Sequence, residues 1–276
     1  MGEYISPIAF SWNFWYDGNV NNDDKAITLG HPSYVWRFGQ DRRLDLMRRF
    51  VRFPGVHILD IGCGIGAYLE KFRNLGAHEF GVDTDAEKLD DAHHDKRLIR
   101  LAASASEALP FADETFHVVL LHEVIEHVND DRATMREAQR VLKKNGRILV
   151  FAPNRLYPFE THGAYFGKRY VFGNIPFIGW LPDFLRAKCA PHVRAYRARE
   201  IRALFERMDG DILTHTQIYP GYDKIARRSA ILAWILRGVT YFFEKTPFRA
   251  FGLSHFIVWK KFGRRSTRVD PTRPMA

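Results

Sequence analysis

Short apolar runs and amphipathic segments alternate through the middle of the chain. The runs predict strands, and apolar residues that recur every three or four positions predict helices. We therefore expect strands near 56–61, 79–83, 97–102, 116–121, 147–152, 211–218 and 254–260. We expect helices over about 66–75, 85–94, 130–143 and 199–207, the third capped by Asn129 or Asp130. Such alternation is typical of an α/β fold with a mostly parallel sheet.

A glycine-rich loop follows the first expected strand. Asp60 ends the strand, and Gly62, Gly64 and Gly66 come next, before a helical pattern. Glycine has no Cβ, so the backbone can turn tightly and lie flush against a ligand. The second strand ends in Asp83, at a spacing that suits an acid bonded to a ribose diol. The pattern predicts a nucleotide site at the carboxyl edge of the sheet.

Two kinds of nucleotide fit this loop. The spacing Gly62-x-Gly64-x-x-Ala67 matches the dinucleotide fingerprint G-x-G-x-x-G/A. A pyrophosphate, however, favours a helix N-terminus without a nearby anion, and Asp60 is such an anion. An acid there suits the ammonium and sulfonium of S-adenosylmethionine. The pattern Asp60-x-Gly62-x-Gly64-x-Gly66 resembles motif I of the class I S-adenosylmethionine-dependent methyltransferases.

The resemblance extends over residues 52–153, because three further motifs follow in the family's order. They are E-A-L-P-F at 107–111, R-V-L-K-K-N-G-R at 140–147, and Pro153-Asn154. The family implies a Rossmann-like, mostly parallel seven-stranded sheet, with helices on both faces and an antiparallel strand near one edge. It also implies a set of donor contacts. On this chain they fall on Asp60, Gly62, Cys63, Gly64, Gly66, Asp83, Thr84, Ser106, Glu107, Leu121 and His122. The alternative for Asp83 is a helix N-cap.

The run H-E-V-I-E-H at 122–127 is the candidate for acceptor chemistry. Glu123, Glu126 and His127 would converge on one face of a helical turn and could hold a divalent metal. The spacing is similar to E-x-x-E-H in ubiquinone-type quinone O-methyltransferases and small-RNA 2′-O-methyltransferases. There a later histidine completes a metal site; His192 is our first choice for it and His162 our second.

Two readings of this turn remain open. In one, Mg²⁺ or Zn²⁺ is held by Glu123, Glu126, His127 and His192. In the other, no metal binds, the turn orders the loop beside the cofactor, and His127 or His192 is the general base. The candidate catalytic residues are His127, His192 and Glu123.

The chain divides into a central domain and additions. We expect an aromatic and basic N-terminal extension over 1–51, a methyltransferase domain over 52–262 and a disordered basic tail over 263–276. Insertions at about 154–197 and 219–253 interrupt the domain. The first is rich in aromatic residues and predicts a lid over the acceptor pocket. In the second, the apolar stretch 225–243 predicts a cap helix packed on the core, with a helix on a membrane surface as the alternative.

Composition narrows the function further. The 46% apolar content supports a substantial core, and no run is long enough to span a membrane. Two cysteines form no disulfide framework, which indicates a reduced, cytoplasmic protein with membrane-surface contact as an option. The net charge of +9 includes a basic tail and does not indicate DNA binding. We expect methyl transfer to a hydroxyl of a small-molecule, lipid-linked or sugar acceptor. The alternatives are an RNA methyltransferase and a non-catalytic scaffold that binds S-adenosylmethionine at a membrane or partner surface.

Overall fold

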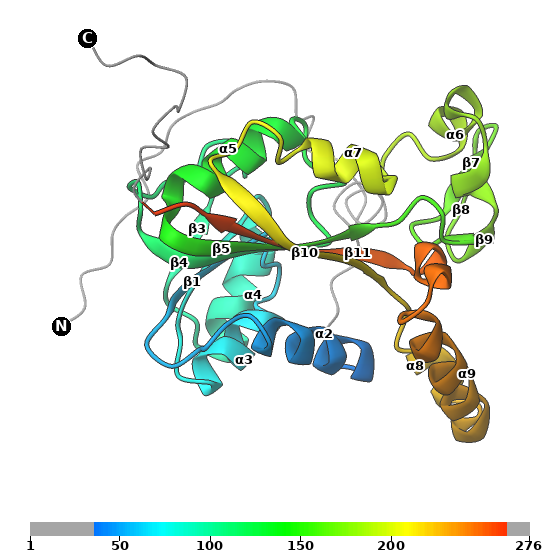
Figure 1. Cartoon of the computed structure of the whole chain (residues 1–276), viewed down its shortest axis with the longest axis horizontal. Coiled ribbons are helices and arrows are strands. Elements are labelled where there is room, and N and C mark those ends of the chain that lie inside the picture. The colour runs from blue at the N-terminus through cyan, green and yellow to red at the C-terminus, as the bar shows by residue number, and fades with distance from the viewer. Residues whose placement is uncertain (1–35, 264–276) are drawn as a thin grey trace, which may run out of the picture.

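The computed structural model describes residues 36–263, and a seven-stranded sheet lies at its centre (Figure 1). The strand order is β10-β11-β5-β4-β1-β2-β3. The strands are β1 (His57–Ile61), β2 (His78–Asp83), β3 (Leu101–Ala103), β4 (Phe116–His122), β5 (Leu142–Pro153), β10 (Gly210–Ile218) and β11 (Ser254–Lys261). Only β11 runs antiparallel to its neighbours β5 and β10. The expected fold class, with its antiparallel strand near one edge, is confirmed.

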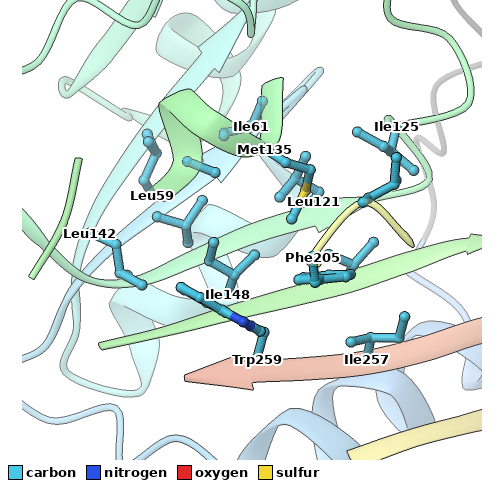
Figure 2. Packing of buried hydrophobic residues seen from close by; sticks show 14 of the residues in the cluster. Leu59, Ile61, Leu121, Ile125, Met135, Leu142, Ile148, Phe205, Ile257 and Trp259 are labelled. Carbon is cyan, nitrogen blue, oxygen red and sulfur yellow. The ribbon is translucent and has the colours of Figure 1, made fainter. Parts of the chain in front are cut away.

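Helices cover both faces of the sheet (Figure 1). On one face lie α2 (Phe38–Arg48), α3 (Ala67–Asn74) and α4 (Ala86–Lys96), and on the other α5 (Asp131–Val141) and α7 (Ala198–Ala203). Figure 2 shows the core under α5, where side chains from β1, β4, β5 and β11 interdigitate. Burial of each such side chain contributes about 1.5–3 kcal/mol. Leu44 and Met47 of α2 pack into the opposite core, so this part of the N-terminal extension is built into the domain.

Most expected elements are present, and the differences lie at their ends. The Asp130 side chain caps α5 by accepting from the Ala133 N–H at 2.9 Å, as expected. β3 begins at Leu101 rather than near 97, because α4 continues to Lys96 and ends at Arg97, whose φ is 53°. β5 begins earlier than expected and α7 ends earlier. Residues 1–35 of the expected extension and 264–276 of the expected tail lie outside the described residues.

The first insertion forms a small unit after β5, which we name the cap (residues 154–197). It contains β6 (Phe159–Glu160), β7 (Ala164–Phe166), β8 (Arg169–Val171), β9 (Ile175–Pro176), η1 (Ile178–Trp180) and α6 (Asp183–Cys189). Ala164, Ile178 and Val193 belong to its own hydrophobic cluster. Asn154 ties its start to the second insertion by donating to the carbonyls of Ala250 and Gly252. The cap follows the carboxyl end of β5, so it is joined to the edge where the ligand site was expected.

The second insertion forms an arm that projects from the body (Figure 1). This arm (residues 219–253) holds α8 (Asp223–Ala226), α9 (Ala230–Phe243) and η2 (Pro247–Phe251). Ala233 is the buried residue of α9, whereas Ile231 and Trp234 are 74% and 75% exposed. The expectation that α9 packs its apolar side chains on the core is therefore wrong. Arg237 and Tyr241 of α9 contact α2 instead, at Phe38 and Arg42.

Within residues 36–263, no helix has both the length and the apolar character needed to cross a membrane.

A histidine pair between β10 and β11 should make the fold acid-sensitive. His215 Nε2 lies 3.0 Å from His255 Nδ1. Burial, followed by the nearby charge of His255, lowers the pKa of His215 to about 4. The unfolded chain has the higher pKa of about 6.5 and takes up the proton first, so the stability present above about pH 6.5 is lost as the pH falls toward 4.

We expect His215→Gln to lose less thermal stability than the wild type between about pH 7 and pH 5. Glutamine can still donate to His255, but it does not titrate. Thermal unfolding at both pH values tests this, with the exposed His94→Gln as the control. Equal acid losses in the wild type and His215→Gln would contradict the assignment.

Candidate functional site

The three glycines between β1 and α3 adopt a backbone that other residues rarely adopt. Their φ values are 69°, 51° and 71° at Gly62, Gly64 and Gly66. A Cβ at Gly62 would collide with Val124 in the turn after β4, and one at Gly66 would collide with Leu98. A Cβ at Gly64 would meet no heavy atom within 4 Å. The loop is therefore tightly packed at Gly62 and Gly66, whereas the backbone at Gly64 is open to a ligand.

Two carboxylates flank this backbone. Asp60 is 3% exposed, and its Oδ1 has no hydrogen-bond partner in the described part of the chain. Burial, and then the charge of Asp83, raises the pKa of Asp60 well above its usual value. Asp83 accepts from the Gly64 N–H at 2.8 Å and from the Asp85 N–H at 2.9 Å. Asp85 rather than Asp83 caps α4, so the N-cap alternative for Asp83 is wrong.

Ser106 and Glu107, expected beside the adenine, have side chains that bind the protein itself. Ser106 Oγ lies 2.9 Å from Thr134 Oγ1 and 3.0 Å from a Glu107 oxygen. The other Glu107 oxygen accepts from the N–H groups of Asn129 and Asp130. These bonds fasten the loop before α5, and a role for both residues at the adenine stays a prediction.

The other expected donor contacts differ in exposure. Cys63 is buried, and its Sγ would lie 2.7 Å from a Cβ built at Gly81, so it packs against β2. Leu121 is fully buried in the core of Figure 2. Thr84 is exposed directly after β2. Thr84 is therefore the one of these three side chains that a ligand could reach without displacing others.

Arg43 of α2 organises a polar network that the sequence did not reveal. Its guanidinium contacts His122 Nε2 at 2.7 Å, Glu123 Oε1 at 2.8 Å and Ser254 Oγ at 2.9 Å. Tyr68 Oη lies 3.2 Å from the same His122 nitrogen. The only signal in the sequence was the basic helical pattern that ends at Arg52.

The network fixes the charges of His122 and Glu123. A guanidinium can only donate, so His122 Nε2 accepts and its proton lies on Nδ1. Burial, followed by Arg43, lowers the pKa of His122 to about 3. Burial alone would raise the pKa of Glu123, but Arg43, His122 and Ser254 outweigh it and lower this pKa to about 2. Glu123 is therefore an anion paired with Arg43, and His122 is neutral.

Glu126, His127 and His162 form a second polar cluster at the same edge. One ligand atom from each lies within 4.8 Å of the others. Both Glu126 oxygens and His127 Nδ1 are buried without a hydrogen-bond partner among the described residues. Burial and the charge of Glu123 raise the pKa of Glu126, whereas burial and His162 lower the pKa of His127 to about 4. Glu160 lies 3.1 Å from His162 Nδ1, which leaves Nε2 of that ring available.

This cluster differs from the expected set in two members. Glu123 has a φ of 55°, which a right-handed helical turn excludes, and its carboxylate goes to Arg43 and Ser254. His192 Nε2 lies 3.3 Å from the His162 carbonyl oxygen, and its buried Nδ1 is unpartnered among the described residues. The structure thus places His162 of the cap, our second choice, beside Glu126 and His127, in the place expected for His192. Whether a metal binds stays a prediction.

Known proteins resemble this chain in sequence and in fold. Residues 59–150 match a family described as a methyltransferase domain. The ubiquinone biosynthesis O-methyltransferase of Mesorhizobium japonicum is 32% identical over 193 residues, which are 65% of this chain and 70% of that protein. The enzyme of the same name from Parvibaculum lavamentivorans is 33% identical over 187 residues, which are 66% of this chain and 70% of that protein. The chain spans 60% of the length of the Brucella ovis enzyme of that name, at 32% identity over 56% of this chain.

Solved structures agree on the fold. A methyltransferase dependent on S-adenosylmethionine from Mesorhizobium loti superposes with a TM-score of 0.55 at 14% identity, covering 79% of this chain and 96% of its own. A possible histamine N-methyltransferase from Thermotoga maritima superposes with a TM-score of 0.53 at 16% identity, covering 87% of this chain and 94% of its own. The sequence relatives, the family match and the sheet order agree. This chain belongs to the class I S-adenosylmethionine-dependent methyltransferases.

Proposed function

We propose that the chain transfers a methyl group from S-adenosylmethionine to a hydroxyl of a small-molecule, lipid-linked or sugar acceptor. One observation carries the proposal: the glycine loop and the Glu126–His127–His162 cluster adjoin at the carboxyl edge. β1 and β4 pair side by side, and Gly62 lies against Val124 in the turn that carries the cluster. Donor and acceptor would therefore meet where the two strands end.

The residues of the loop fit the donor. The open face at Gly64 leaves room for a ligand against the backbone, and the unpartnered Asp60 oxygen can take a cationic group. Asp83, already held by two backbone N–H groups, is oriented to accept ribose hydroxyls with its remaining lone pairs. The donor supplies an activated methyl group, so the protein mainly aligns the reactants and excludes water.

Three observations support an oxygen acceptor. His127 is neutral at pH 7 because its pKa is lowered to about 4 by burial and His162, and an uncharged imidazole can accept a hydroxyl proton. His192 can do so through its unpartnered Nδ1. A carboxylate with two imidazoles also suits a divalent cation such as Zn²⁺ or Mg²⁺, which would lower the pKa of an acceptor hydroxyl. The related proteins named as ubiquinone O-methyltransferases support the choice of oxygen.

Glu126→Gln tests the acceptor side of the proposal. We expect Zn²⁺ or Mg²⁺ to raise the unfolding temperature of the wild type, and the variant to lose this response because its amide is a poor ligand. Methyl transfer should fall by about 10–100-fold, whereas affinity for S-adenosylhomocysteine should change by less than about twofold, because Glu126 lies outside the glycine loop. Calorimetry and incubation of labelled donor with fractionated lipid, glycan and RNA pools measure these quantities.

The exposed Glu206→Gln is the matched control, and it should alter none of these readouts. Equal losses of donor affinity and methyl transfer in Glu126→Gln would contradict a role at the acceptor. A metal response that survives in the variant would remove Glu126 from the metal set, and the lack of any metal response in the wild type would leave His127 or His192 as the base.

The same incubation separates the alternatives. Transfer to the RNA pool would indicate an RNA methyltransferase, and donor binding without transfer to any pool would indicate a scaffold. One feature weighs against RNA. A basic hollow of about 540 Å³, lined by Arg48, Arg49, Arg52 and Arg147, lies near the amino ends of β1 and β5. It is thus at the opposite edge from the site and does not lead into it.

A further inference from the structure

Helix α9 of the arm presents its large apolar side chains outward. In an α-helix, Ile231, Ile235, Val239 and Phe242 lie along one face. They are between 46% and 74% exposed, and Trp234 beside them is 75% exposed. The opposite face holds Ala233, Arg237 and Thr240. This orientation is the reverse of that in an ordinary surface helix, where apolar residues face the core.

Hydrogen bonds and a cation–π contact join the arm to the body and fix the outward orientation of the apolar face of α9. Asp223 accepts from the N–H groups of Phe38 and Gly39 at 3.0 and 3.2 Å. Arg237, the only charged residue of α9, donates to the Gly221 carbonyl at 2.8 Å and lies 3.8 Å from the centre of the Phe38 ring. These contacts turn the charged side of α9 inward and leave its outward face without charge.

The exposed charged residues of the arm all have one sign. Residues 219–253 contain two acids, and both face the body. Asp223 accepts from the Phe38 N–H of α2. Glu244 forms an ion pair with Arg42 and accepts from the Tyr219 N–H. The exposed charged residues of the arm are Lys224, Arg227, Arg228, Lys245 and Arg249. They lie just before and just after α9. An apolar face with a tryptophan, bordered at both ends by cations, complements an anionic lipid surface.

We propose that the arm docks this protein on anionic membranes, with the outward face of α9 lying in the headgroup region parallel to the surface. The helix has 14 residues and would not cross the bilayer. A second copy of the chain is a poorer occupant, because a symmetric contact would bring the same five cations against each other. Docking on lipid is independent of the methyl-transfer proposal, and a failure of one leaves the other standing.

Flotation of the full chain with lipid vesicles tests the proposal. We expect binding to vesicles of phosphatidylcholine mixed with phosphatidylglycerol, weaker binding to phosphatidylcholine alone, and a decrease as salt rises. Ile231→Asp should lower the vesicle affinity by about tenfold or more, because an apolar side chain no longer leaves water and an anion meets anionic lipid. Arg227→Glu with Arg228→Glu should also lower it by about tenfold or more.

Matched controls come from the same chain. Ile99 lies just before β3, the edge strand opposite β10, and is 71% exposed. Ile99→Asp therefore makes the same change as Ile231→Asp at nearly the same exposure, but far from the arm. Arg202→Glu with Arg207→Glu makes the same charge change at exposed positions outside the arm. Both controls should bind vesicles as the wild type does. Failure of the wild type to float with anionic vesicles would overturn the proposal, and so would equal losses in Ile231→Asp and Ile99→Asp.

Discussion

Replacing Asp83 with alanine should weaken the binding of S-adenosylhomocysteine by about a hundredfold or more. A hydrogen bond to a charged group contributes about 1.5–3 kcal/mol, and a ribose diol offers two such bonds to this carboxylate. The substitution also frees the Gly64 N–H, which Asp83 holds at 2.8 Å, so the loop that should receive the donor is no longer fixed. The variant therefore loses both the hydrogen bonds to the ribose and the fixed conformation of the glycine loop.

Asp85→Ala is the matched control for this prediction, because the same side chain is removed two residues away. Asp85 caps α4 through the Glu87 N–H at 3.2 Å, and loss of such a cap costs about 1 kcal/mol of stability. Calorimetry should show a much smaller loss of ligand affinity in Asp85→Ala than in Asp83→Ala. An unchanged affinity in Asp83→Ala would refute the assignment of Asp83 to the donor.

Replacing Arg43 with methionine should lower the free energy of unfolding by about 3 kcal/mol. Removal of one partner from a buried ion pair typically costs about 3–5 kcal/mol, since the other charge is left without compensation. We expect the lower end because the Glu123 side chain is 24% exposed. Methionine keeps the length and apolar character of the stem, so the loss reports on charge rather than on packing. Denaturant unfolding at neutral pH measures it.

Two further variants make this prediction specific. Arg43→Met combined with Glu123→Gln should recover part of the lost stability, because the uncompensated charge is gone. Arg48→Met, on the same helix, should cost less than about 1 kcal/mol, since its partner Asp45 is exposed. A double variant that is less stable than Arg43→Met alone would show that the pair does not act through charge.

The sequence was sufficient for the sheet and the donor loop because both depend on local patterns. Apolar runs specify β1 and β4, and the three glycines fall where φ is positive. Asp83 could be placed from its distance along the chain. Such features recur in open α/β nucleotide sites, so their spacing along the chain is enough to find them.

The polar clusters could not be predicted in the same way, because they depend on contacts between distant segments. Arg43 meets Ser254 across more than two hundred residues of chain, and no local pattern indicates that pairing. Glu123 was assigned to a helical turn, but its left-handed backbone turns it toward Arg43. The choice between His162 and His192 depended on how the cap folds. For α9, the sequence pattern indicates an apolar face but not whether that face turns toward the body or toward solvent.

The cap contributes His162 to a cluster whose other members belong to the turn after β4, yet it has a small core of its own. Under the proposed function, exchanging this segment for that of a related enzyme would replace the His162 imidazole together with the small core that positions it. On the same proposal, a graft that lacks a histidine at this position should yield a folded hybrid with impaired methyl transfer.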